Sequence, residues 1–137
     1  MVQFTAKTNT QGLNKKLKGL EEMIEAKLRD TFENMAFDAT QWSPVDTGAY
    51  VNSFSFKTNS RSRGRRQTSH GKLKNQDAQS KRGEGFNKLL GDLNGIDLMA
   101  TKSVTLRNDA QHARAVEDGL PTKPGYGVFR KLRNKYG

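Results

Sequence analysis

The stretch Pro44-Val45-Asp46-Thr47-Gly48-Ala49-Tyr50-Val51-Asn52-Ser53-Phe54 lies between a long helical pattern and a short strand pattern. Pro44 cannot continue a helix, because it has no backbone N–H and its ring clashes with the preceding turn. Asp46 and Thr47 are residue types that cap helices, and Gly48 tolerates a sharp bend. The stretch therefore predicts a hinge, in which a long helix ends, the chain turns once, and a strand runs back along the helix.

The helical pattern before the hinge runs from about Thr10 to Gln41. Its apolar residues recur every three or four positions, as on one face of a helix: Leu13, Leu17, Leu20, Ile24, Leu28, Phe32, Met35 and Ala39. A helix of about 30 residues would be about 45 Å long, which is more than a domain of this size needs for itself. We expect it to lie across a sheet and to continue into a neighbour's surface, and a coiled coil is the alternative.

Alternation of apolar and polar residues predicts strands at Val2–Lys7, Ser53–Thr58 and Lys102–Arg107. The second and third of these should pair antiparallel. Trp42, the only tryptophan, is expected to be a packing anchor at the hinge.

Two shorter helices are expected in the second half of the chain. One begins near Phe86 and is broken by Gly91 and Gly95, since glycine weakens helices. The other spans Ala110 to Asp118, is capped by Asp109 and ends at Gly119, a natural helix terminus. Residues 120–125 are expected to lack regular structure, and the rest of 120–137 to form a basic C-terminal tail.

Residues 59–85 differ in character from the rest of the chain. Between positions 60 and 83 there are eight basic residues and one acid, Asp77, with Leu73 as the single large aliphatic residue. Such a segment cannot bury enough apolar surface to fold alone, which predicts a mobile insertion between two strands. Its cations are candidate contacts with DNA or with a protein partner: Arg61, Arg63, Arg65, Arg66, Lys72, Lys74, Lys81 and Arg82. Since no aromatic residue is interleaved, nucleic-acid binding would be independent of sequence. The alternative is a solvated loop without a partner.

Length and composition indicate one domain, residues 1–137, with a small core, because only 33% of the residues are hydrophobic. Thin cores often complete their burial at subunit interfaces. The net charge of +10 favours contact with nucleic acid or an acidic surface. The absence of cysteine excludes disulfides and thiolate metal sites and fits assembly in a reducing cytoplasm. No apolar run is long enough to cross a membrane. The expected fold class is α+β: a small antiparallel sheet crossed by one long N-terminal helix, a short helix near the C-terminus, and a long basic insertion loop.

Residues that would carry catalysis do not form a recognisable pattern. His70 and His112 share no metal-ligand spacing. Asp46 is interpreted as a turn cap, and Glu117 as a subunit-interface or turn contact rather than a catalyst. No glycine-rich loop follows a strand with the spacing that cradles phosphate. We therefore expect no enzyme activity, cofactor, metal or small-molecule substrate.

The hinge stretch and a later block, Asn108-Asp109-Ala110-Gln111-His112-Ala113-Arg114-Ala115-Val116-Glu117-Asp118-Gly119, together resemble a known family. The resemblance is to the head–tail joining proteins of tailed phages, the neck or tail-completion proteins also described as minor tail components. It covers roughly residues 10–58 and 101–137 and leaves out the middle. The turn and interface residues within the two blocks are Pro44, Asp46, Thr47, Gly48, Glu117 and Gly119, and Trp42 is added to them for its place at the hinge.

The resemblance implies a structural virion protein, assembled in the host cytoplasm, that forms a homo-oligomeric ring, often a hexamer, in the phage neck. The ring would join the head connector to the tail and surround the DNA channel. Its partners would be connector or adaptor proteins, tail terminator or tail tube proteins, and genomic DNA. The alternative from composition is a free nucleic-acid-binding protein that acts through its basic arm without sequence specificity.

Overall fold

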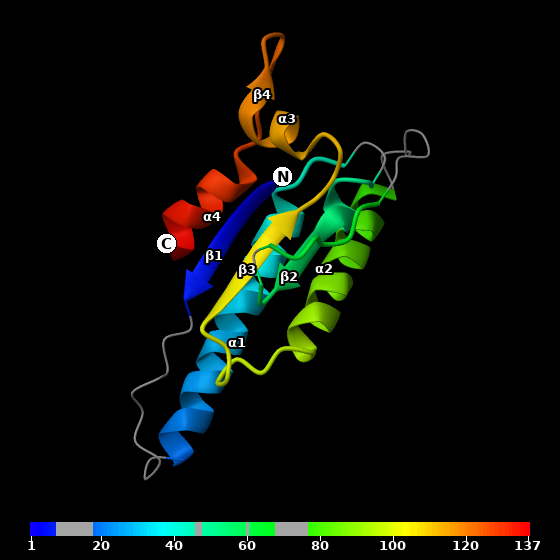
Figure 1. Ribbon diagram of the computed structural model, residues 1–137. Coiled ribbons are helices and arrows are strands. Elements are labelled where there is room, and N and C mark those ends of the chain that lie inside the picture. Colours follow the sequence, from blue (N-terminus) through cyan, green and yellow to red (C-terminus); the bar gives the residue numbers. More distant parts are fainter. Residues whose placement is uncertain (8–17, 46–47, 60, 68–76) are drawn as a thin grey trace.

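A three-stranded antiparallel sheet forms the centre of the computed structural model, which describes residues 1–7, 18–45, 48–59, 61–67 and 77–137 (Figure 1). Its strands are β1 (Val2–Lys7), β2 (Phe54–Lys57) and β3 (Ser103–Asn108), and β3 lies between the other two. All three predicted strands are confirmed, and so is the antiparallel pairing of β2 with β3. The predicted α+β class is confirmed as well.

The register gives the sheet one apolar and one polar face. Phe4, Leu106 and Phe56 stand in one row across the three strands, whereas Gln3, Arg107 and Ser55 form the neighbouring row. Because successive side chains of a strand point to opposite faces, these two rows lie on opposite sides of the sheet. The apolar face meets the helices, and the polar face is covered by another part of the chain.

The long helix α1 (Lys18–Gln41) crosses the apolar face of the sheet. Its 24 residues span roughly 36 Å. Phe32 packs edge-on against Phe56 of β2, with ring centroids 5.8 Å apart, and Met35, Ala36 and Ala39 are buried beside it. The first turns of α1 extend past the end of the sheet, as expected (Figure 1). The earlier part of the predicted helix, residues 10–17, lies outside the described residues.

The second helix corrects the sequence analysis. We expected a loop up to Gly85 and then a broken helix, but α2 (Ala78–Asn94) is continuous and ends at Gly95. A glycine costs about 1 kcal/mol in a helix interior. Full burial of Leu89 and Leu93 in the core offsets that cost. The predicted basic loop over residues 59–85 is therefore not confirmed, because its last residues are the first turns of α2.

The C-terminal region also differs from the expectation. After α3 (Ala113–Asp118), the strands β4 (Gly119–Leu120) and β5 (Lys123–Pro124) pair in a small hairpin, where no regular structure was expected. Residues 128–136, expected to be part of a basic tail, form the helix α4 (Val128–Tyr136). Three of its apolar residues, Val128, Phe129 and Leu132, are fully buried. Their spacing places them on one face, so the helix is held by the protein's own core.

The end of α1 anchors α4. Asp38 accepts hydrogen bonds from Lys135 Nζ and from the Tyr136 hydroxyl, both at 2.6 Å. The Trp42 ring packs against the core, and the ammonium groups of Lys131 and Lys135 lie 5.9 Å and 5.8 Å from its centroid. The predicted role of Trp42 as a packing anchor at the hinge is therefore confirmed.

The hinge itself bends at Gly48, whose φ of 85° lies in a region that favours glycine. A short 3-10 helix, η1 (Val51–Ser53), then precedes β2, where the sequence predicted a strand directly after the turn. Asn108, at the end of β3, donates to the carbonyl of Tyr50 at 2.8 Å and ties the hinge to the sheet. Asp46 and Thr47, the predicted caps, lie outside the described residues.

The close approach of α2 to η1 predicts opposite effects for two glycines of the same helix. A Cβ at Gly85 would lie 2.4 Å from the carbonyl oxygen of Val51, whereas a Cβ at Gly83 would meet nothing within 4 Å. We expect Gly85→Ala to lower the free energy of unfolding by roughly 1–3 kcal/mol through overpacking. Gly83→Ala, the matched control, should raise it by up to about 1 kcal/mol. Urea denaturation measures both, and equal effects would contradict the assigned contact.

Candidate functional site

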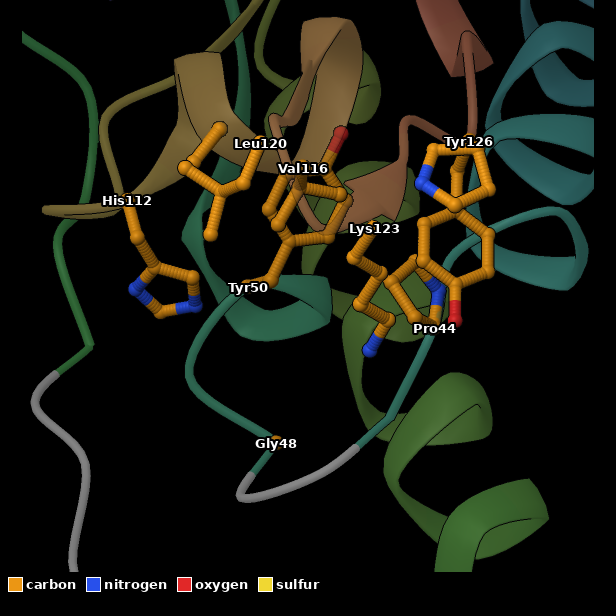
Figure 2. Close-up of a pocket in the computed structure, with 10 residues that line it drawn as sticks. Pro44, Gly48, Tyr50, His112, Val116, Leu120, Lys123 and Tyr126 are labelled. Atoms are coloured by element: carbon orange, nitrogen blue, oxygen red, sulfur yellow. The ribbon is translucent and has the colours of Figure 1, made fainter.

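The two blocks that the sequence analysis singled out face each other across a groove of about 290 Å³ (Figure 2). One wall comes from the hinge and the other from α3 and the β4–β5 hairpin. We call this the Pro44 groove, and its lining residues are Pro44, Gly48, Tyr50, His112, Ala115, Val116, Leu120, Lys123, Pro124 and Tyr126. The lining is mainly apolar, and its polar side chains among the described residues are Lys123, His112 and the phenols Tyr50 and Tyr126.

Tyr50 forms part of the groove wall from inside the core. It is 4% exposed, and its ring packs edge-on against Phe54 with centroids 5.3 Å apart. Its buried hydroxyl has no hydrogen-bond partner among the described residues. Burial, assisted by the nearby negative charge of Glu117, raises the pKa of Tyr50 far above its ordinary value. The phenol therefore stays neutral and serves packing rather than proton transfer.

Glu117 holds the start of α4 within the same chain. Its Oε2 accepts a hydrogen bond from the Phe129 backbone N–H and its Oε1 accepts one from the Arg130 N–H, both at 2.9 Å. A carboxylate at a helix N-terminus satisfies free N–H groups and interacts favourably with the helix dipole. Glu117 therefore makes a turn contact within the chain, and its place at a subunit interface stays a prediction. The neighbouring Gly119 ends α3 with a φ of 88°, which agrees with its predicted place at a helix terminus.

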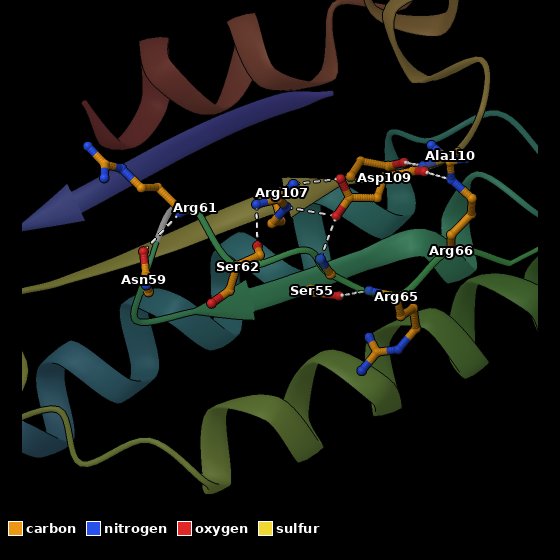
Figure 3. A network of polar contacts seen from close by, with 11 residues as sticks. Ser55, Asn59, Arg61, Ser62, Arg65, Arg66, Arg107, Asp109 and Ala110 are labelled. Carbon is orange, nitrogen blue, oxygen red and sulfur yellow. Dashed lines mark hydrogen bonds and ion pairs between the residues drawn. The ribbon is translucent and has the colours of Figure 1, made fainter.

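The second candidate site is the arginine-rich segment, residues 61–67, which lies over the polar face of the sheet (Figure 3). Its anchor is Arg107 of β3, whose side chain is 5% exposed. The guanidinium donates to both carboxylate oxygens of Asp109 at 2.7 Å and to the carbonyl oxygen of Ser62. Asp109 also accepts a hydrogen bond from the Gly64 N–H at 2.7 Å. This network binds the segment to the sheet through backbone groups.

Arg65 and Asp92 close the open edge of the sheet. Arg65 donates to the carbonyl oxygen of Phe54 at 2.5 Å, and Asp92 accepts from the Phe56 N–H at 3.1 Å. The two side chains also form an ion pair at 2.7 Å. An unpaired edge strand is a template for pairing with another chain. The pair satisfies edge groups of β2 and so opposes association through this edge.

The predicted contact cations thus lie in different settings. Arg66 donates to the carbonyl oxygen of Asp109 at 2.7 Å, Lys81 pairs with Glu84 at 3.2 Å, and Arg82 donates to the carbonyl oxygen of Ser43 beyond the end of α1. Arg61 and Arg63 are exposed, and neither has an acidic partner among the residues that the structure describes. Lys72 and Lys74 lie outside the described residues. Within the segment, Arg61 and Arg63 therefore remain the cations best placed to meet an external partner.

Sequence reasoning missed the roles of Arg107, Asp109 and Asp92. Asp109 was interpreted as the cap of a following helix, but α3 begins only at Ala113. The alternation of β3 contained a usable signal, since it placed a charged residue, Arg107, on the face opposite Leu106. It did not indicate what would cover that face. For Lys123, Tyr126 and His112 in the groove, the sequence carried no comparable signal.

The described part of the chain lacks two kinds of feature, a metal-binding cluster and a membrane-spanning helix. It contains no group of three or more histidine, cysteine, aspartate or glutamate side chains that could hold a metal ion. Within the same ranges, no helix has the length and apolar character needed to cross a bilayer.

Comparisons with protein-family models, with curated proteins and with solved structures found no match to this chain.

The edge pair predicts different effects for two arginines of the same segment. Arg65→Ser should lower the free energy of unfolding by roughly 1.5–3 kcal/mol, because charge-assisted hydrogen bonds are lost and the Phe54 carbonyl is left unpaired. Arg63→Ser, the matched control, should change it by no more than about 0.5 kcal/mol. Urea denaturation tests this, and an Arg65→Ser variant as stable as the control would refute the edge-closing role.

Asp109 predicts a pH dependence of stability. Burial alone would raise its pKa, but the hydrogen bonds from Arg107 and the Gly64 N–H, with the charge of Arg107, outweigh burial and lower it. A lowered folded-state pKa means that the stabilisation is present above the unfolded value of about 3.9 and is lost as the pH falls through the folded value.

We therefore expect Asp109→Asn to be less stable than the parent by roughly 3 kcal/mol at pH 7, because it breaks a buried ion pair. The difference should begin to shrink below about pH 4, where the carboxylate becomes protonated in the unfolded chain, and should be lost once the pH has fallen through the lowered pKa of the folded protein. Urea denaturation across a pH series measures this, with the exposed Asp30→Asn as control. A difference that does not change with pH would contradict the ionic role of Asp109.

Proposed function

We propose that this protein is a structural virion protein of a tailed phage, a neck or tail-completion protein that forms a homo-oligomeric ring, with six copies as the expected number. The ring joins the head connector to the tail and surrounds the DNA channel. The proposal rests on the resemblance of the two sequence blocks. It is supported by their arrangement in the fold, where segments about 60 positions apart line one groove (Figure 2).

The observation that supports a role in assembly is the exposed apolar surface at both ends of the molecule. The first turns of α1 expose Leu20 by 43% and Met23 by 69%, and the β4–β5 region exposes Leu120 by 57% and Tyr126 by 38%. Figure 1 places these regions at opposite ends, both projecting beyond the sheet. Large exposed apolar side chains grouped on projecting elements are typical of interaction surfaces. A protein that acts as one member of a ring needs two such surfaces.

The charge distribution is compatible with a channel for DNA. The exposed face of α4 carries Arg130, Lys131 and Arg133, and Arg61 and Arg63 add exposed cations on the polar side of the sheet. Sequence-independent contact with the phosphate backbone uses such cations. Neighbouring connector, adaptor, tail terminator or tail tube rings are the expected protein partners.

The same exposed arginines favour the second candidate, a free nucleic-acid-binding protein without sequence specificity. In that function the groove and the projecting ends would have no assigned role. The two functions differ in their response to salt, since binding through phosphate contacts weakens steeply as salt rises, whereas apolar association between subunits does not.

Light scattering coupled to size-exclusion chromatography distinguishes them. For the neck function we expect the purified protein to form an oligomer of defined mass that persists in high salt. A protein that stays monomeric at its highest soluble concentration, and that binds duplex DNA only at low salt, would overturn the neck proposal in favour of the second function.

A further inference from the structure

We propose that the tip of α1 of one copy docks in the Pro44 groove of the next copy, in a head-to-tail contact. By the α1 tip we mean residues 19–25. The proposal rests on the proposed function for the existence of an oligomer, and adds which surfaces meet.

The Pro44 groove offers an apolar floor with a basic rim. Lys123 and His112 belong to its lining, which contains no acid among the described residues; Asp46, between Pro44 and Gly48 in the sequence, lies outside them. A second hollow adjoins it, shares Pro44, Lys123 and Tyr126, and adds Arg82; of the residues that the structure describes, no acid lines it. An occupant that complements this surface presents apolar side chains flanked by carboxylates.

The α1 tip has that chemistry. Residues 19–25 contain three acids and no base. Leu20 and Met23 are three residues apart, so they lie on one face of the helix, and both are exposed. Glu22 beside them is exposed as well. Apolar anchors at helical spacing are the form in which a helix binds a groove, and methionine adapts to irregular cavities.

The positions exclude a contact within one copy. The tip and the β4–β5 hairpin lie at opposite ends of the molecule (Figure 1). Because each copy carries both halves of the contact on different surfaces, the association is heterologous and repeats from copy to copy. Such a contact closes into a ring when the rotation between copies permits it. The complementary charge and apolar character of the two surfaces within one chain are the reason to assign the occupant as a second copy.

Disulfide trapping tests the contact, since the chain contains no cysteine. We would prepare Met23→Cys and Leu120→Cys as separate proteins, mix them, and oxidise the mixture. Disulfide formation requires the two Cα atoms to approach within about 7 Å. We expect covalent dimers from the mixture and a ladder of covalent oligomers from the double variant. The matched control pairs Met23→Cys with Asn87→Cys, an exposed position on α2.

A charge-reversal pair provides a second readout that needs no cross-link. Glu22→Lys and Lys123→Glu should each weaken the oligomer by about tenfold or more in dissociation constant, and the double variant should restore it. Asp30→Lys, which reverses an exposed acid two turns farther along α1, should leave the constant unchanged.

The outcomes separate this inference from the proposed function. If the parent forms a defined oligomer but cross-linking equals the Asn87 control and the double reversal fails to restore assembly, the contact is wrong while the ring proposal stands. If Met23→Cys alone cross-links with itself and not with Leu120→Cys, the tips meet each other and the head-to-tail contact is refuted. A monomeric parent would overturn both proposals.

Discussion

A shortage of apolar residues constrains this fold more than any single bond does. With 33% hydrophobic residues, the chain can supply one apolar sheet face and little more. That face is built from the row of Phe4, Leu106 and Phe56, and Phe32 of α1 packs on it. The helices α1, α2 and α4 then bury their apolar faces around the same core. Segments that do not reach this core must be held by polar contacts or by contact with another molecule.

The polar face of the sheet shows how polar contacts do this. Arg107, buried on that face, is acceptable because Asp109 and the Ser62 carbonyl satisfy its donors. A buried charge without partners costs several kcal/mol, so the network fixes the position of residues 61–67 as firmly as packing would. Arg65 and Asp92 extend the same principle to the edge of β2. A segment that composition predicted to be mobile is, where the structure describes it, part of the sheet's cover.

Apolar side chains also remain exposed at the two projecting ends of the molecule. The tip of α1 is apolar and acidic, and the Pro44 groove is apolar and basic. Neither surface is buried within the chain, and the contact that we propose between them would complete the burial that the thin core leaves unfinished. In this view the hinge at Gly48 serves two purposes, since it returns the chain to the sheet and also forms one wall of the groove.

The sequence by itself determined the elements whose patterns are local. Strand alternation, the three-to-four spacing of α1, and the hinge after Pro44 follow from backbone sterics and from side-chain periodicity, which any window of the chain displays. The tertiary structure alone decided the early start and the continuity of α2, the β4–β5 hairpin and α4. The glycines and prolines in or beside them argue against regular structure locally. Distant partners reverse this, because the core buries Leu89 and Leu93, and Glu117 caps α4. The Pro44 groove and the Arg107–Asp109 network were also decided by the tertiary structure. Each joins residues that come close together only after the sheet has formed.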